Sequence, residues 1–198
     1  GQQYFERIKV AAGRMRLLIK DLLQFSRTNK SEKVFEMADL NEILEAAKHE
    51  IAESISDKSA IIKSEHLPTL KVIPFQIQQM FINLLGNSIK YSKANVPPEI
   101  HIDYRKISLQ QIGQLVLPAK KDFHKFTFSD NGIGFSEEYS QRIFELFSRL
   151  HNKDEIAGTG IGLAICKKIV ENHKGYILAK GKPGEGAVFE IYLPEDIA

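Results

Sequence analysis

The sequence predicts an α/β fold, a two-layer sandwich with one mixed sheet and packed helices, preceded by a long N-terminal helix. Three observations support this prediction. Short runs of alternating apolar residues are interleaved with amphipathic helical stretches. Two such runs near the C-terminus flank a Pro-Gly-Glu-Gly turn, as in an antiparallel hairpin. Residues 1–30 carry a heptad repeat, which is typical of a helix that packs on a partner helix.

The composition is that of an ordinary globular protein. The 198 residues are 43% hydrophobic and 26% charged, with a net charge of +2. This weak charge argues against nucleic acid or an anionic membrane surface as a partner. The single cysteine, Cys166, excludes an internal disulfide, and its apolar helix predicts a buried, inert thiol. No signal peptide or spanning apolar stretch occurs, so we expect a cytoplasmic location and no membrane contact by this part.

Residues 2–29 are predicted to form one amphipathic helix. Its apolar seam has two sets of heptad positions, Ile8, Met15 and Leu22, then Ala11, Leu18 and Phe25. A single helix cannot bury such a seam, so we predict a partner helix from a second protomer or from an upstream part of the protein. Because the chain starts inside this pattern, we expect it to be the C-terminal part of a longer protein, which leaves upstream membrane anchoring open.

The next elements alternate between strands and helices. A polar linker over residues 28–34 precedes a predicted strand over residues 34–37. Asp39 and Glu42 then form a capping box for a helix that runs to about Ser56. Short strands are predicted over residues 60–64 and 70–73.

A helix over residues 75–92 carries the first candidate site. Its apolar stripe is Ile77, Met80, Phe81, Leu84, Leu85 and Ile89. Asn83, Asn87 and Lys90 share another face, with Tyr91 one turn after Asn87. A solvated polar face would account for them, but asparagine is a poor helix former. An asparagine carbonyl is a good ligand for Mg²⁺, and a lysine one turn on would suit the phosphates that arrive with it.

Strands are predicted over residues 100–107 and 123–129. The residues between them, 108–122, are less regular and could hold a short hairpin around residues 115–117. The second strand runs into Asp130-Asn131-Gly132-Ile133-Gly134, the first glycine motif. Taken alone, Asp-Asn-Gly is an ordinary turn signal.

The second glycine motif, Gly158-Thr159-Gly160-Ile161-Gly162-Leu163, opens an apolar helix over residues 161–173. Ser136 is expected to cap a short helix that precedes this motif in the sequence. Glycines let backbone N–H groups approach an anion, and a helix N-terminus favours negative charge. No Gly-Lys-Ser/Thr follows, which excludes a P-loop, and no βαβ unit starts here, which excludes a Rossmann site. Strands over residues 176–180 and 187–193 end the fold.

Four motifs in this order resemble those of two-component sensor histidine kinases. They are the asparagine motif (Asn83 to Tyr91), the first glycine motif, the phenylalanine motif (Phe144 to Phe147) and the second glycine motif. The resemblance covers residues 1–195 and implies the ATPase fold shared with gyrase, heat-shock chaperones and mismatch-repair proteins. It divides the chain into the second helix of the dimerisation and phosphotransfer hairpin, 1–30, and a catalytic ATP-binding domain, 31–198.

The resemblance implies ATP and Mg²⁺ as ligands. Asp130 would accept a hydrogen bond from the adenine amino group, because a carboxylate only accepts and disfavours a guanine keto oxygen. Gly132 and Gly134 would let the chain pass close to the base. Asn87 would hold Mg²⁺, and Asn83 would support the metal or the phosphates through water.

The remaining implied roles concern phosphate and the lid over residues 136–157. Lys90 and Tyr91 would contact phosphate and ribose. The second glycine motif would wrap the triphosphate through Gly158, Thr159, Gly160, Ile161, Gly162 and Leu163, although Thr159 could simply shape the turn. Arg149 resembles a phosphate-contacting lid arginine, with a solvated arginine as the alternative. Phe144 and Phe147 are expected to anchor the lid. The implied catalytic residues are Asn83, Lys90 and Arg149.

The chain departs from the family in lacking the phospho-accepting histidine. None of its six histidines lies in the expected setting, so we expect all to be structural or exposed: His49, His66, His101, His124, His151 and His173. The chain should therefore bind ATP without phosphorylating itself. A response regulator receiver domain and a second kinase protomer, which contacts the N-terminal helix, are the implied partners.

Two other functions stay open. One is an ATP hydrolase of the same superfamily, but those enzymes carry a glutamate base at the position of Asn83, and an asparagine cannot take a proton from water. The other is a non-catalytic nucleotide-binding module. Serine-directed kinases of the superfamily would not need the heptad helix.

Overall fold

A computed structural model describes the chain except for residues 1, 31–33, 109–121, 149–157 and 196–198. The expectations for a hairpin at 115–117 and for Arg149 and His151 lie outside the described residues. The α-helices are α1 (Gln2–Lys30), α2 (Leu40–Glu50), α3 (Ala52–Lys58), α4 (Pro74–Lys90) and α6 (Gly162–Asn172). Two short 3₁₀ helices are η1 (Glu137–Tyr139) and η2 (Arg142–Phe144).

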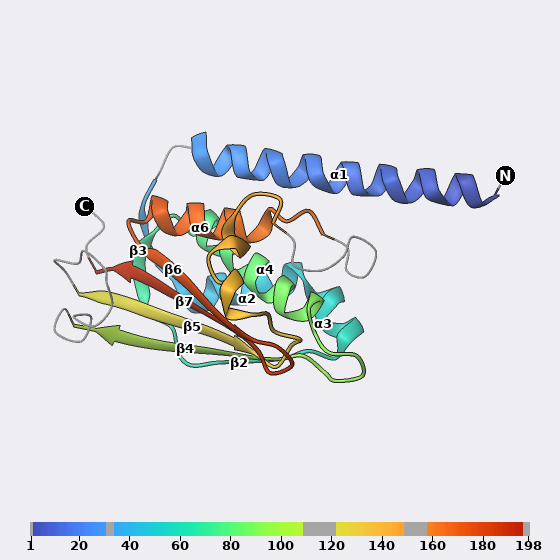
Figure 1. Cartoon of the computed structure of the whole chain (residues 1–198). Helices are drawn as coiled ribbons and strands as arrows, with labels where there is room; N and C mark the ends of the chain where they lie inside the picture. The colour runs from blue at the N-terminus through green and yellow to red at the C-terminus, as the bar shows by residue number, and fades with distance from the viewer. Residues whose placement is uncertain (1, 31–33, 109–121, 149–157, 196–198) are drawn as a thin grey trace.

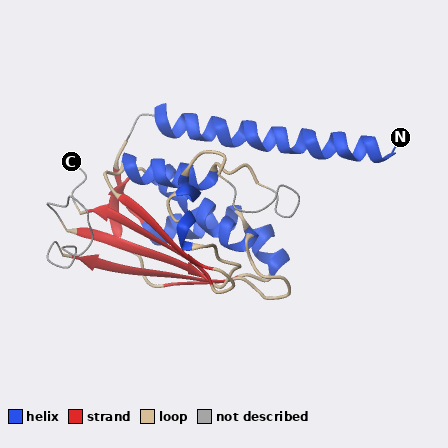
Figure 2. Cartoon of the chain, viewed as in Figure 1, coloured by secondary structure: helices blue, strands red, loops and turns tan. Residues whose placement is uncertain are grey.

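The strands form a mixed sheet, as the sequence predicts. They are β1 (Glu36–Asp39), β2 (Ile61–Ser64), β3 (Thr69–Val72), β4 (Glu99–Ile107), β5 (Phe123–Asp130), β6 (Tyr176–Lys182) and β7 (Gly186–Pro194). Five of them follow the order β2-β4-β5-β7-β6, with β2 and β4 parallel and the other pairs antiparallel. The remaining strands, β1 and β3, pair in a separate antiparallel sheet, which the sequence analysis did not anticipate. Helices α2, α4 and α6 lie over the five-stranded sheet, which confirms the two-layer sandwich (Figures 1 and 2).

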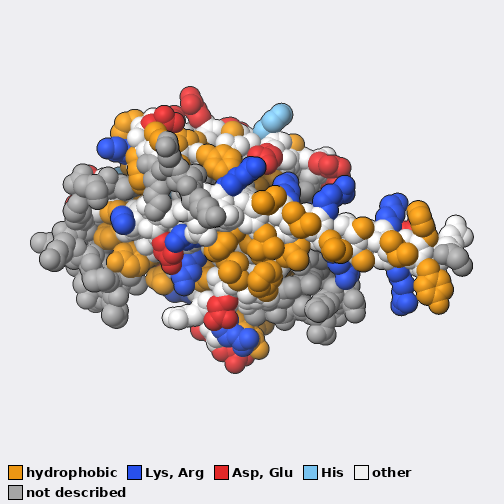
Figure 3. Space-filling model, turned by 90° about the horizontal axis from the view of Figure 1, so that it is seen from above, with side chains coloured by type: hydrophobic (Ala, Val, Ile, Leu, Met, Phe, Trp, Pro, Cys, Tyr) orange, Lys and Arg blue, Asp and Glu red, His pale blue; other side chains and the backbone are white. Residues whose placement is uncertain are grey.

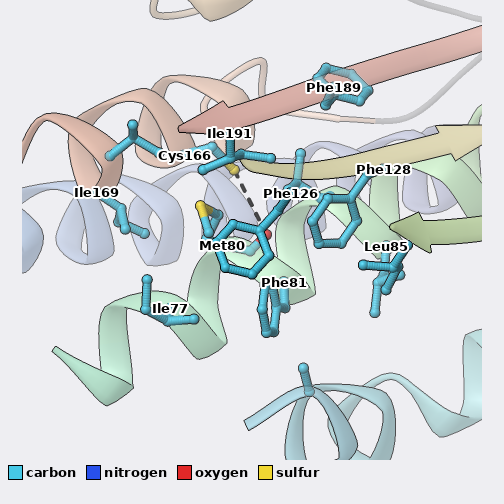
Figure 4. Close-up of a cluster of buried hydrophobic side chains, with 14 of the residues drawn as sticks. Ile77, Met80, Phe81, Leu85, Phe126, Phe128, Cys166, Ile169, Phe189 and Ile191 are labelled. Atoms are coloured by element: carbon cyan, nitrogen blue, oxygen red, sulfur yellow. Dashed lines mark hydrogen bonds between the residues drawn. The ribbon is translucent and has the colours of Figure 1, made fainter. Parts of the chain in front are cut away.

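The core lies between α4, α6 and the sheet. The predicted stripe of α4 is buried throughout, with no member more than 3% exposed. Phe126 and Phe128 point from β5 toward this stripe, and the Phe81 and Phe128 rings are 5.6 Å apart (Figure 4). Cys166 is fully buried among them, and burial raises its pKa to about 12, which confirms an inert thiol.

The starts of α2 and η1 differ from the prediction in their capping hydrogen bonds, and α2 is shorter than predicted. Asp39 caps α2 by accepting a 2.8 Å hydrogen bond from the Asn41 N–H. The predicted single helix is interrupted at Ile51, whose φ of −106° and ψ of 21° lie outside the helical region, so α3 is a separate helix. Ser136 occupies the N-cap of η1, but its side chain makes no capping hydrogen bond.

Helix α1 lies along the α/β sandwich beside α6 (Figure 1). Leu18 and Phe25 pack against the domain core, and Asn172 of α6 donates a 3.0 Å hydrogen bond to the carbonyl oxygen of the buried Thr28. The predicted apolar seam of α1 is therefore divided into a part that packs on the core and a part that is exposed. Its other positions remain exposed, at 67% for Ile8, 63% for Met15 and 39% for Leu22. Figure 3 looks down onto α1 and shows hydrophobic side chains along this surface.

Candidate nucleotide-binding site

Two adjoining recesses lie where α4, the end of β5 and the start of α6 meet. The first is lined by Asn87, Ser88, Tyr91, Asp130, Gly134, Phe135, Ile143, Ser148, Leu163, Ala187 and Phe189. The second is lined by Leu17, Asp21, Asn83, Asn87, Lys90, Tyr91, Ile143, Ser148, Gly158, Thr159, Gly160, Gly162 and Leu163. Because Asn87, Tyr91 and Leu163 line both, the recesses form one continuous site.

Asp130 lies at the floor of the first recess, where β5 ends. Its Oδ1 accepts hydrogen bonds from the backbone N–H groups of Gly132, at 2.9 Å, and Ala187, at 3.1 Å. Its Oδ2 accepts a 2.8 Å hydrogen bond from the Ser88 hydroxyl. The carboxylate is thus held in one orientation, with Oδ2 able to accept one more hydrogen bond.

The glycines of the first motif serve close backbone packing. A Cβ at Gly132 would lie 2.6 Å from the Tyr91 carbonyl oxygen, at the end of α4. Gly134 has φ +65°, and a Cβ there would collide with the Lys182 carbonyl oxygen of the β6–β7 hairpin. Gly132 lines neither recess, so its role is to let the motif pack on α4, whereas Gly134 does line the first recess.

The asparagine and lysine face of α4 turns toward the second recess. Asn83 and Lys90 line it together with Asn87, as the helical spacing predicts. The Asn83 side-chain nitrogen is buried and has no hydrogen-bond partner among the described residues. An unpaired buried donor is costly, so a ligand oxygen or water at this position would stabilise it.

Lys90 and the second glycine motif meet in the same recess. The Lys90 ammonium lies against Gly158, where a Cβ would collide with it, and 4.7 Å from the centre of the Tyr91 ring. Gly160 adopts φ +73°, and its carbonyl oxygen accepts a 2.9 Å hydrogen bond from the Phe147 N–H. This arrangement gathers a cation and a glycine-rich backbone around one space, as anion binding requires.

Two residues of these motifs, Ile161 and Phe147, lie differently from their neighbours in the site. Ile161 is fully buried in the core and lines neither recess, because it occupies the N-cap of α6 and faces inward. Phe144 is buried as a lid anchor should be, but Phe147 is 55% exposed and takes a left-handed φ of +64°. Phe147 therefore anchors through its backbone bond to Gly160 and not through its ring.

Two of the described histidines are buried and hydrogen-bonded. His173 is buried, its Nδ1 bonds the Ile169 carbonyl oxygen at 2.7 Å, and its Nε2 accepts from the Ile73 N–H at 3.0 Å. His124 is also buried, with Nδ1 2.8 Å from the Tyr104 hydroxyl oxygen, and burial lowers its pKa. Both are structural, as predicted.

Several site residues were missed by the sequence analysis. Ser88 follows Asn87 in the asparagine motif, but its position predicted no ligand role. Ala187 and Phe189 come from β7, and Leu17 and Asp21 come from α1. No local signal marks these residues, because their place in the site depends on how distant elements pack.

The site fits a nucleotide with a bound metal. Asp130 supplies a hydrogen-bond acceptor, the lining of the first recess is mostly apolar, and the second recess supplies Lys90 and the unpaired Asn83 side-chain nitrogen. Asn87 lines both recesses, and its side-chain carbonyl offers an oxygen suited to Mg²⁺. Across the described part of the chain, no group of three or more His, Cys, Asp or Glu residues could hold a metal by itself.

The fold and the site define an ATPase-type nucleotide-binding domain. The family described as "Histidine kinase-, DNA gyrase B-, and HSP90-like ATPase" matches residues 73–197. The chain belongs to this family, and within it the chain resembles the sensor histidine kinases.

Individual relatives support this assignment. Cyanobacterial phytochrome A of Nostoc sp. is 36% identical over 91% of this chain, and the sensor protein kinase WalK of Staphylococcus haemolyticus is 32% identical over 93%. The chain spans only 22% and 29% of the length of these two proteins. Full-length ShkA in complex with AMPPNP matches all of this chain and 39% of its own, with a TM-score of 0.71 and 22% identity. Among the described helices, none is both long and apolar enough to cross a bilayer.

Proposed function

We propose that this chain is the ATP-binding catalytic part of a two-component sensor histidine kinase. In this proposal residues 31–198 bind Mg²⁺ and ATP, and residues 1–30 form the second helix of the dimerisation and phosphotransfer hairpin. The phosphate acceptor is a histidine on an upstream helix that this chain does not contain. An aspartate of a response regulator receiver domain then receives the phosphate, in the cytoplasm.

The observation that carries the proposal is the orientation of Asp130. Three donors hold its carboxylate in a mostly apolar recess, with Oδ2 able to accept from an exocyclic amino group. An adenine ring would fill the recess against Leu163 and Phe189. The phosphates would then extend into the second recess, which Lys90 and the Asn83 amide line.

In this proposal the residues of the site act by positioning the nucleotide and stabilising charge. The imidazole nitrogen of the incoming histidine attacks the γ-phosphorus, a phosphorus–nitrogen bond forms, the bond to the β-phosphate oxygen breaks, and ADP leaves. Lys90 stabilises charge on the phosphates, and the second glycine motif supplies N–H donors. Bound Mg²⁺, held through the Asn87 oxygen, would neutralise phosphate charge.

The exposed seam of α1 supports a second protomer as partner. Ile8, Met15 and Leu22 leave a row of apolar side chains on the outer side of the helix, and a parallel row on a second copy would cover it. In the same proposal, α1 also contributes to the surface that a receiver domain contacts.

The test is a calorimetric titration of ADP and a non-hydrolysable ATP analogue, with and without Mg²⁺. Asp130→Ala should lower the ADP affinity about tenfold or more, because a hydrogen bond to a charged group contributes about 1.5–3 kcal/mol. Asp103→Ala is the matched control, since Asp103 lies on the neighbouring strand and outside both recesses. A folded wild-type chain that binds neither nucleotide would refute the proposal.

A second assay separates kinase from hydrolase. The chain is mixed with labelled ATP and a separate hairpin protein that carries the phospho-accepting histidine. Label on the hairpin, lost in Asn87→Ala, supports a histidine kinase. Steady release of free phosphate without labelled protein would favour the hydrolase alternative instead.

A further inference from the structure

We infer that Ser88 is a positioning residue for the adenine-binding carboxylate, and that it determines how strongly the site recognises a 6-amino group on the purine. The inference rests on the proposed function and deepens it. Ser88 lies within the asparagine motif, but the roles proposed above are those of Asn83, Asn87, Lys90 and Tyr91.

The geometry around Asp130 makes Ser88 distinct. An ionised carboxylate offers about four lone-pair positions. Gly132 and Ala187 bond Oδ1 through their backbones, and Ser88 bonds Oδ2 through its side chain. The two backbone donors fix one oxygen, so the Ser88 hydroxyl decides the rotation of the carboxylate and thus the direction in which Oδ2 faces the recess.

Ser88 is also held firmly itself. It lies in the last turn of α4, is 5% exposed, and lines the first recess beside Asn87. The hydrogen bond to Asp130 therefore joins the helical layer to the end of the central strand β5. A buried hydroxyl on a rigid helix is a better orienting group than one on a loop, because little side-chain entropy remains to be lost.

The direction of this hydrogen bond has a chemical consequence. The Ser88 hydroxyl donates to Oδ2 of Asp130, so it presents only lone pairs elsewhere. The polar groups contributed by Ser88 and Asp130 to the recess are then acceptors. A purine with a 6-amino donor can bond there, whereas one without it leaves the desolvated acceptor Oδ2 unpaired.

The experiment compares two ligands that differ only in the amino group, ADP and purine riboside 5′-diphosphate. Both are titrated calorimetrically into the full chain, as wild type, Ser88→Ala and Ser129→Ala. Ser129 is the matched control because it precedes Asp130 on β5 and lines neither recess. Thermal unfolding of each variant shows that it is folded.

We expect Ser88→Ala to weaken ADP binding about tenfold while the binding of the purine analogue changes about twofold or less. The preference for ADP over the analogue should therefore fall by roughly fivefold, and Ser129→Ala should match wild type. If Ser88 had only a structural role, Ser88→Ala would weaken the binding of both ligands equally.

Two results would overturn the assignment alone: equal losses for the two ligands in Ser88→Ala, or no loss for ADP, while wild type binds ADP and prefers it. A wild-type chain that does not bind ADP would overturn the proposed function and this inference together. The two failures are thus distinguishable.

Discussion

Thr159 donates a hydrogen bond of 2.5 Å to the Asp21 carboxylate, joining the second glycine motif to α1 across 138 positions of sequence. Asp21 and Leu17 line the recess that also holds Asn83 and Lys90. The N-terminal helix thus places a carboxylate beside the space assigned to the phosphates. This contact connects the position of α1 to the electrostatics of the site.

Replacing that carboxylate should favour a phosphate ligand. Asp21→Asn keeps a side chain of the same size and removes a negative charge that repels the phosphates, so ADP should bind about threefold more tightly at low salt, with a smaller gain at high salt. Glu6→Gln, at an exposed position on the same helix, is the control and should change little. Calorimetry at two ionic strengths measures both. Weaker ADP binding by Asp21→Asn would show instead that the Thr159 contact is needed to shape the loop.

Two glycine substitutions should have opposite effects on stability. Gly134→Ala forces a Cβ into the Lys182 carbonyl oxygen at a φ of +65°, so the free energy of unfolding should fall by about 2–4 kcal/mol. Gly86→Ala, inside α4 with open space around it, should raise it by about 0.5–1 kcal/mol. Urea denaturation compares the two. A neutral Gly134→Ala would mean that the hairpin can move aside.

The ionisation of Glu190 should make the free energy of unfolding depend on pH in the acid range. Burial would raise the pKa of its carboxyl, but the Lys125 ammonium at 2.5 Å, assisted by Lys180 at 3.5 Å, lowers it below the usual 4.5. A lowered folded-state pKa means that the contribution is present above pH 4.5 and is lost as pH falls through the folded value.

Glu190→Gln tests this dependence. Its free energy of unfolding at pH 7 should fall by about 1–3 kcal/mol, because Lys125 is left half-buried without its partner. The difference from wild type should shrink as the pH drops below 4.5. Urea denaturation at several pH values measures it, and a constant difference at every pH would contradict the assignment.

The reactivity of the Cys166 thiol should report global unfolding of the chain. With a pKa of about 12 and no exposure, its thiol should not react with an aromatic disulfide reagent at pH 8 in the native chain. It should react at once in denaturant, and no other cysteine interferes. Fast labelling of the folded chain would show that α6 opens locally.

Local patterns predicted the elements of the site well. The 3.6-residue period of α4 places its apolar stripe in the core and turns Asn83, Asn87 and Lys90 to another face, as expected. Local patterns were less reliable at chain reversals. After α6, Lys174 takes the left-handed φ of +59°, although it is not a glycine, and Gly175 has no room for a Cβ beside the Tyr192 carbonyl oxygen.

The sequence by itself determined the fold class, the order of the four motifs and the residues that present polar groups to the site, because periodicity and motif spacing are properties of neighbouring residues. Only the tertiary structure decided the contacts of Asp130 with Ser88 and of Asp21 with Thr159, and the division of the α1 seam. These relationships join residues 42 and 138 positions apart. Their partners are set by how helices and sheet pack, which no local pattern encodes.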